Sequence, residues 1–216
     1  MGVYQLTAER RERIRIPGIT ELPPSGPGMR IGLFGGSFNP PHEGHRLVAL
    51  QCLKRLDLDA VWLLVTPGNP LKHNAALPPI EDRVRAARKL IRHPQIRVTG
   101  FEAAHGFRYS YETIRHLLRA LPDRRFVWIM GADNLRDFHH WERWREIAEV
   151  IPIAVYVRPG SELRAPVAQA ATALARWRLD ESDAELLAGR DPPAWVFIHG
   201  MMSALSSTAI RASSKA

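Results

Sequence analysis

The chain has 216 residues, of which 45% are hydrophobic and 24% charged, enough for one globular domain with a full core or two small ones. No apolar run approaches the roughly 18–20 residues that cross a membrane, and residues 1–15 are polar and arginine-rich without the apolar core of a secretory signal. The single cysteine, Cys52, rules out an internal disulfide and lies in an apolar helical stretch typical of a buried, inert thiol. Together these features predict a cytoplasmic protein.

The net charge of +8 has two interpretations: a nucleic-acid surface, or a small-molecule phosphate site on an arginine-rich protein. Of the 30 basic residues 4 are lysines, and the arginines are scattered along the chain rather than gathered in one block. Scattered arginine favours the second interpretation, so we expect small-molecule partners and neither nucleic acid nor membrane. The sequence does not indicate the oligomeric state.

The chain divides into a predicted flexible arm, residues 1–28, and one domain, residues 29–216. The arm ends in a stretch rich in proline and glycine, residues 23–28, that cannot hold a strand or helix. Strands are predicted at 31–34, 60–66, 96–99, 126–130, 153–157 and 195–198, and helices at 44–56, 80–92, 110–120, 141–149, 162–178 and 206–213. This order predicts an α/β fold: a doubly wound, mostly parallel, Rossmann-like sheet with helices on both faces and ligands at the carboxyl ends of its strands.

The most informative segment follows the first predicted strand, where residues 35–45 read GGSFNPPHEGH. Gly35 and Gly36 lack the Cβ that would hold a phosphate away from the backbone. The helix that begins near residue 43 points its unpaired N–H groups and positive dipole end at the same place. His42 and His45 can then donate to phosphoryl oxygens. The alternatives are two solvated histidines, or a zinc site that lacks a nearby cysteine or third ligand.

This segment resembles the H-x-G-H signature of the nucleotidyltransferase superfamily, and its form is most similar to that of bacterial nicotinate-nucleotide adenylyltransferases. That family usually has an acidic residue where this chain has Asn39. The resemblance extends over about residues 30–211, nearly the whole chain except the arm.

Three segments in the middle of the chain resemble elements that bind the acceptor nucleotide in this family. They are the proline-rich loop 66–73, the segment 108–113, and the run from Gly131 to Trp141. In the family the tryptophan stacks on the pyridine ring, and an indole suits this because its electron-rich face meets a cationic ring. The alternative is a core tryptophan at Trp141, although Trp144 could equally be the buried one.

Local alternatives also stay open in these segments. Ser110 could simply cap a helix, Asp133 could be a plain N-cap, and Lys72 could be a solvated surface lysine. The turn at residues 156–160 is similar to the family's V-x-R-P-G turn, for which we expect an architectural role.

A second phosphate motif lies near the C-terminus, where residues 205–211 read LSSTAIR. Ser206 or Ser207 is a natural N-cap whose helix could bind an anion, and Arg211 follows about one turn later with a permanent charge. The motif resembles the family's I-S-S-T-x-I-R, which holds the triphosphate of ATP. A capped helix with a solvated arginine is the alternative.

The resemblance implies a role for each matching residue, with His42 and His45 as the catalytic pair. Implied ATP-binding residues are Gly35, Gly36, Ser37, Phe38, His42, His45, Ser206, Ser207, Thr208 and Arg211. Implied mononucleotide-binding residues are Asn39, Lys72, Tyr111, Thr113, Gly131, Asp133 and Trp141. Mg²⁺ is expected to arrive bound to ATP and water, because no cluster of acidic residues marks a protein metal site.

The implied reaction is adenylyl transfer from ATP to nicotinate mononucleotide, which gives deamido-NAD and pyrophosphate in NAD biosynthesis. The acceptor phosphate is already ionised at neutral pH, so the absence of an obvious nucleophile or general base in the motifs agrees with it. The alternatives are another nucleotidyltransferase, acting on nicotinamide mononucleotide or phosphopantetheine, and a non-catalytic nucleotide-binding regulatory protein.

Overall fold

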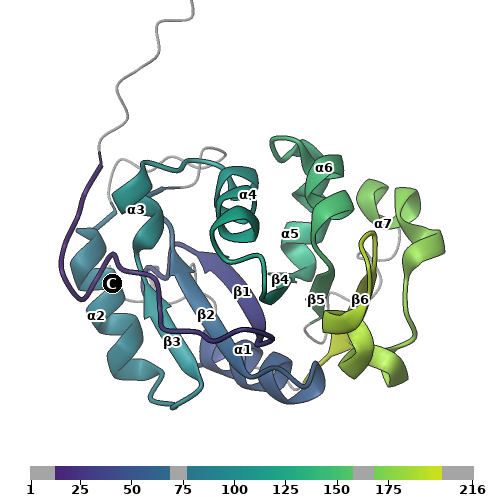
Figure 1. Ribbon diagram of the computed structural model, residues 1–216, viewed down its shortest axis with the longest axis horizontal. Coiled ribbons are helices and arrows are strands. Elements are labelled where there is room, and N and C mark those ends of the chain that lie inside the picture. The colour runs from purple at the N-terminus through teal and green to yellow at the C-terminus, as the bar shows by residue number, and fades with distance from the viewer. Residues whose placement is uncertain (1–12, 69–76, 158–167, 201–216) are drawn as a thin grey trace, which may run out of the picture.

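The computed structural model describes residues 13–68, 77–157 and 168–200 (Figure 1). Its centre is a sheet of six strands in the order β3-β2-β1-β4-β5-β6, and every neighbouring pair is parallel. The strands are β1 (Arg30–Gly36), β2 (Ala60–Val65), β3 (Ile96–Thr99), β4 (Arg125–Gly131), β5 (Ile153–Val157) and β6 (Trp195–His199). The predicted α/β doubly wound fold is therefore confirmed, with a wholly parallel sheet among the described residues.

Helices cover both faces of the sheet (Figure 1). They are α1 (Glu43–Arg55), α2 (Ile80–Leu90), α3 (Phe101–His105), α4 (Ser110–Ala120), α5 (Ala132–Asp137), α6 (Trp144–Val150) and α7 (Gln169–Ala173), with 3₁₀ helices η1 (Phe138–His140), η2 (Ala175–Trp177) and η3 (Glu181–Gly189). None of the helices in the described part of the chain is long and apolar enough to cross a membrane.

Two separate apolar layers, one on each face, hold these helices to the sheet. Successive strand residues alternate between them: Leu33 faces the layer that contains α4 and α6, and Phe34 faces the layer of α1, α2 and η3. The middle strands are buried on both faces, and all six residues of β2 are buried. This explains why β2 has the continuous apolar sequence of an internal parallel strand.

The strand order reverses between β1 and β4. From β1 the chain winds outward through β2 to β3, returns to the other side of β1 as β4, and then winds outward through β5 to β6. In an open parallel sheet such a reversal leaves a crevice at the carboxyl ends of the two strands, where ligands bind. The histidine motif follows β1 and Gly131 ends β4, so both predicted motifs flank this crevice.

The predicted helices differ from the observed ones mainly in their bounds. The helix predicted at 141–149 begins only at Trp144, because α5 and η1 fill the preceding residues and Trp141 has extended backbone angles. The described part of the helix predicted at 162–178 is two short pieces, α7 and η2, divided at Leu174. The expected polar loop before β6 contains η3, and the helix predicted at 206–213 lies outside the described residues.

Residues 13–28, the described part of the predicted arm, pack on the domain. Ile19 and Thr20 are buried, and the Ile19 carbonyl accepts the backbone N–H of Gly100 at 2.9 Å. At the other end of the segment Gly28 N donates to Asp123 O at 2.6 Å. These contacts tie residues of the segment to the ends of the sheet, while the division of the chain at residue 28 and the flexibility of residues 1–28 stay predictions.

Candidate active site

The two histidines of the motif form a reciprocal cap at the first turn of α1. His42 is the N-cap, and its Nδ1 accepts the N–H of Gly44 at 3.1 Å. In return, Nδ1 of His45 accepts the backbone N–H of His42 at 3.2 Å. An Nδ1 that accepts such a bond carries no proton, so each neutral ring holds its proton on Nε2 and is a donor there.

The two imidazoles lie together, with ring centroids 3.8 Å apart and planes inclined by 32°. His42 is buried and His45 is half-buried. The two Nε2–H donors therefore gather within one turn of the entrance of α1, at the carboxyl end of β1. Such an arrangement can hold an oxyanion and stabilise negative charge that grows on it.

Aromatic rings give the two glycines of the motif a packing role. A Cβ on Gly36 would lie 3.2 Å from the Phe38 ring, and one on Gly35 would lie 3.1 Å from the indole of Trp128. Phe38 itself is buried with a left-handed φ of 45°, and its ring meets the His45 ring edge-on at 4.9 Å. The phosphate contact expected of Gly35 and Gly36 stays a prediction.

Arg83 of α2 is a buried arginine that the sequence analysis missed. Its Nη1 donates to the carbonyl oxygens of Ser37, at 3.0 Å, and Thr66, at 2.8 Å, and its Nε donates to Pro78 O at 3.0 Å. Burial lowers the pKa of the guanidinium, which nevertheless remains a cation at any ordinary pH. Arg83 thus ties the loop after β1, which carries the histidine motif, to the end of β2.

Part of the predicted acceptor side lies at the starts of α4 and α6, which contact each other. Tyr111 donates its hydroxyl proton to Glu146 Oε2 at 2.9 Å, and the guanidinium of Arg143 lies 5.0 Å from the centre of the Tyr111 ring. Arg143 has a left-handed φ of 53° as the N-cap of α6. This cluster links the two helix starts and includes one of the predicted binding residues.

The structure separates the two tryptophans between which the sequence could not choose. Trp144 is buried in the core, whereas Trp141 is half-buried and has edge contacts with Phe138 at 5.4 Å and with Trp128 at 6.3 Å. Trp141 therefore keeps part of its surface exposed, whereas Trp144 does not. Asp133 is exposed in the first turn of α5, where Gly131 and not Asp133 is the N-cap.

Helix α4 is also capped differently from the expected form. Tyr109 rather than Ser110 is its N-cap, and Glu112 accepts the backbone N–H groups of Tyr109 and Arg108 at 3.1 and 2.9 Å. Thr113 is wholly buried and donates to Glu102 Oε1 at 2.7 Å. Its hydroxyl thus ties α4 to α3.

Several predicted site residues cannot be placed. Lys72, Ser206, Ser207, Thr208 and Arg211 lie outside the described residues, as does the end of the turn at 156–160. The described residue Asn39 lies between Phe38 and the histidines, in the loop after β1. In the part of the chain that is described, no group of three or more histidine, cysteine, aspartate or glutamate side chains could hold a metal ion.

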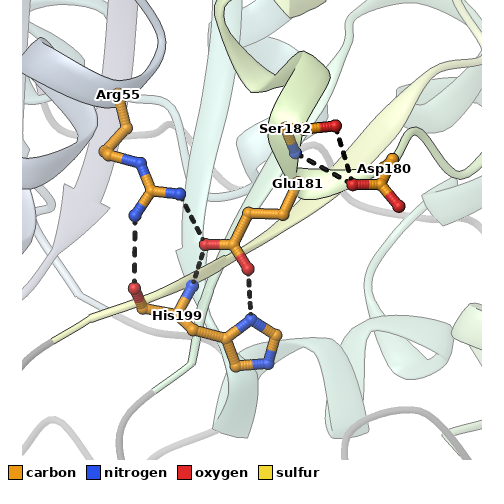
Figure 2. A network of polar contacts seen from close by, with 5 residues as sticks. All are labelled: Arg55, Asp180, Glu181, Ser182 and His199. Carbon is orange, nitrogen blue, oxygen red and sulfur yellow. Dashed lines mark hydrogen bonds and ion pairs between the residues drawn. The ribbon is translucent and has the colours of Figure 1, made fainter.

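A polar network anchors the end of β6, the last described strand. Figure 2 shows Glu181 of η3 between Arg55 of α1 and His199 of β6. Its Oε1 accepts from Arg55 Nη2 at 2.8 Å and from the His199 backbone N–H at 2.9 Å, and its Oε2 lies 2.5 Å from His199 Nδ1. Partial burial acts to raise the pKa of Glu181, but the bonds from His199 and Arg55 outweigh it and the pKa is lowered. The network ties the end of β6 to α1 and η3.

A helix entrance with two imidazole donors, at the reversal of a doubly wound parallel sheet, defines a nucleotide-binding α/β protein. A family model described as cytidylyltransferase-like matches residues 33–213. Proteins named "probable nicotinate-nucleotide adenylyltransferase" are 56% identical in Methylorubrum extorquens, over 85% of this chain and 99% of that protein, and 52% identical in Mesorhizobium japonicum, over 90% and 100%. The chain therefore belongs to the cytidylyltransferase-like family, and within it to the nicotinate-nucleotide adenylyltransferases.

The fold is also similar to that of a solved structure of low sequence identity. It is that of Plasmodium falciparum nicotinic acid mononucleotide adenylyltransferase complexed with NaAD. The two chains superpose with a TM-score of 0.63 at 16% identity, over 85% of this chain and 83% of that one. The matches in sequence confirm the family predicted from the residues, and with it the prediction of a nucleotidyltransferase enzyme.

Proposed function

We propose that this protein transfers the adenylyl group of ATP to nicotinate mononucleotide, giving deamido-NAD and pyrophosphate. The names of relatives that are 52–56% identical over nearly their whole lengths support this substrate pair. The observation that carries the chemistry is the pair of Nε2–H donors that His42 and His45 present at the entrance of α1. Donors placed there suit a reaction in which negative charge builds on phosphoryl oxygens.

The reaction depends on the positions of the two substrates and does not require a general base. An ionised phosphate oxygen of the mononucleotide forms a bond to the α-phosphorus of ATP, while the bond from that phosphorus to the bridging oxygen breaks and pyrophosphate leaves with its electron pair. The attacking oxygen has no proton to lose at neutral pH. Catalysis then depends on holding two polyanions in line and neutralising the charge between them.

His42 and His45 are proposed to contact the α- and β-phosphates of ATP, and residues 206–211 the β- and γ-phosphates. The divalent cation is proposed to arrive with the substrate: Mg²⁺ would be held by triphosphate oxygens and water, which is the way this ion usually enters phosphoryl-transfer sites. Its role is to neutralise charge on the leaving group.

The acceptor side is proposed to lie against α4, the start of α5 and Trp141. Nicotinate carries a carboxylate that only accepts hydrogen bonds, whereas nicotinamide presents donors as well. The first turn of α4, an 11-residue helix, offers backbone N–H donors, and the half-buried Trp141 offers an aromatic face. A site lined with donors leaves the amide of nicotinamide poorly paired, which can discriminate by up to about 10⁴.

Pyrophosphate release from ATP tests the proposal with a panel of acceptors: nicotinate mononucleotide, nicotinamide mononucleotide and 4′-phosphopantetheine. We expect kcat/KM to be highest for nicotinate mononucleotide by a wide margin. Equal or reversed preference between the two pyridine nucleotides would overturn the substrate while leaving adenylyl transfer intact. ATP binding without release for any acceptor would instead indicate a regulatory nucleotide-binding protein.

A further inference from the structure

Two tryptophans lie in one row across the face of the sheet that α4 and α6 cover. Trp62 of β2 and Trp128 of β4 are both register partners of Leu33 in β1, one on each side of it. Both are buried, and the indole Nε1 of neither has a hydrogen-bond partner among the described residues. Within that part of the chain the two rings therefore act through packing and not through a hydrogen bond.

The ring of Trp128 leans along the strands toward the carboxyl end of the sheet. Gly35 follows Leu33 by two residues on β1, so both positions lie on the same face. A Cβ built on Gly35 would lie 3.1 Å from Cη2 and 3.3 Å from Cζ2 of the Trp128 ring. The far end of the indole thus reaches from β4 to the end of β1, where the histidine motif begins.

The same ring contacts Trp141, the tryptophan of the proposed acceptor side. The two ring centroids lie 6.3 Å apart with planes inclined by 85°, which is an edge-to-face contact. Phe138 has a second such contact with Trp141, at 5.4 Å, but it lies in the same segment, and its carbonyl accepts the Trp141 N–H at 2.9 Å. Of these two ring contacts, the one with Trp128 is therefore the one that ties Trp141 to a strand of the sheet.

We propose that Trp128 is a positioning residue for the mononucleotide: its indole spans the distance from the end of β1 to Trp141, and so sets where the Trp141 ring lies relative to the histidine motif. The proposal rests on the proposed function for the role of Trp141. A displaced Trp141 ring stacks less well on the pyridine ring, so binding of the mononucleotide weakens while binding of ATP does not. Trp128 does not touch the reacting atoms; it acts through Trp141.

Trp62 provides the matched control for a substitution of Trp128. It lies on the other side of Leu33 in the same apolar layer, and its ring contacts Phe126, with centroids 6.0 Å apart. Trp62→Phe and Trp128→Phe therefore remove the same atoms from the same row, and of the two rings Trp128 is the one in contact with Trp141. A loss that comes merely from a cavity in this layer should appear in both variants.

The experiment measures steady-state kinetics of the full-length protein with each of these two substitutions, made in the wild type and in Trp141→Ala. In the wild-type background we expect Trp128→Phe to raise KM for nicotinate mononucleotide by about three- to ten-fold and to leave KM for ATP within about two-fold. In the Trp141→Ala background it should raise KM for the mononucleotide by less than about two-fold. Trp62→Phe should leave both KM values within about two-fold in either background.

Fluorine NMR of protein labelled with 5-fluorotryptophan provides a readout that is independent of activity. Trp141→Phe assigns the Trp141 signal, and the shift of that signal between H₂O and D₂O reports the solvent exposure of the ring. This isotope shift should increase in Trp128→Phe and keep its wild-type value in Trp62→Phe.

Gly35→Ala is a second variant, which keeps every aromatic ring. Its methyl group requires the Trp128 ring to move by a few tenths of an ångström. If Trp128→Phe does not fold, the rise in KM for the mononucleotide in Gly35→Ala should likewise disappear in the Trp141→Ala background.

Different outcomes separate the two proposals. If no mononucleotide is turned over, the proposed function fails, and fluorine NMR alone decides the role of Trp128. An equal rise in KM for the mononucleotide with and without Trp141 would overturn the positioning role, and so would a rise of the same size in Trp62→Phe. An unchanged isotope shift of Trp141 in a folded Trp128→Phe protein would overturn it as well.

Discussion

The Nδ1 atom of His45 lies 3.2 Å from the backbone nitrogen of His42, and this bond fixes which nitrogen of the His45 ring can donate to a ligand. Substitution by alanine removes the Nε2–H donor and one half of the cap. We expect His45→Ala to lower kcat by roughly 10²–10⁴, the usual effect of losing a donor to a transition-state oxyanion. Steady-state rates with circular dichroism measure this, and His140→Ala, at an exposed position, is the control. Near-normal turnover in a folded His45→Ala protein would refute the catalytic role.

Arg211 tests the second phosphate motif, which lies outside the described residues. A contact with the β- and γ-phosphates exists in the ground state and in the transition state alike, so Arg211→Ala should mainly weaken ATP binding, by roughly 1.5–3 kcal/mol. Calorimetric titration with a non-hydrolysable ATP analogue measures the loss, and Arg211→Lys, which keeps the charge, should lose less. Unchanged affinity for ATP together with poorer use of the mononucleotide would show that the motif serves the other substrate.

The two tryptophans of the acceptor side should respond oppositely to truncation. Trp144 is buried, so Trp144→Ala should lower the free energy of unfolding by about 3–5 kcal/mol. Trp141 is half-buried, so Trp141→Ala should cost less stability and instead raise KM for the mononucleotide more than KM for ATP. Denaturant unfolding and steady-state kinetics on both variants test this. The assignment of Trp141 fails if its variant loses stability without a change in KM.

Arg83 holds the loop that carries the histidine motif against the end of β2, so its loss should lower the free energy of unfolding. Arg83→Ala leaves the carbonyl oxygens of Ser37, Thr66 and Pro78 without their donor, and we expect a loss on the order of 3 kcal/mol in the free energy of unfolding. Arg85 lies on the exposed side of the same helix, and Arg85→Ala should change stability by less than about 0.5 kcal/mol. If Arg83→Ala and Arg85→Ala have the same free energy of unfolding, the buried hydrogen bonds of Arg83 do not stabilise the folded protein.

Burial raises the pKa of the Glu102 carboxyl group to about 7, and this predicts how stability depends on pH. The unfolded chain ionises Glu102 near its ordinary value of 4.5, whereas the folded protein keeps the proton up to about pH 7. The folded state is therefore penalised progressively between these two values, and the wild type should lose on the order of a few kcal/mol relative to E102Q over that range, with no further loss above it. Unfolding by urea at pH 4.5, 6 and 8 measures the difference. A constant difference would mean an ordinary pKa for the folded carboxyl group.

The sequence was sufficient to predict the sheet and the histidine motif because both depend on local patterns. An uninterrupted apolar run such as 61–65 is buried wherever it pairs, and a glycine turn between strand and helix exposes the same backbone groups in any parallel sheet. The short helices α3 and α5 were not predicted, because five or six residues are too few to show the periodicity of a helix.

The burial of Arg83 and Glu102 was harder to predict, because arginine and glutamate side chains usually lie in solvent. A weak signal existed for Arg83, which lies beside Ile80, Val84 and Ala87 on the apolar face of α2, and for Glu102 between the buried residues Phe101 and Ala103. What the sequence could not supply were the partners, since the Ser37 and Thr66 carbonyls and the Thr113 hydroxyl come from distant positions.

The close approach of Gly36 to the Phe38 ring has an evolutionary consequence. A methyl group on residue 36 would lie 3.2 Å from the Phe38 ring, a tight contact that the ring could relieve only by shifting a few tenths of an ångström. Positions 36 and 38 should therefore vary together among relatives, with a larger residue at 36 appearing only where 38 has become smaller. The Phe38 ring also contacts the His45 ring, with centroids 4.9 Å apart, so a smaller residue at position 38 would remove a contact that holds the imidazole. Sequence change at positions 36 and 38 is therefore restricted by the need to keep His45 in place.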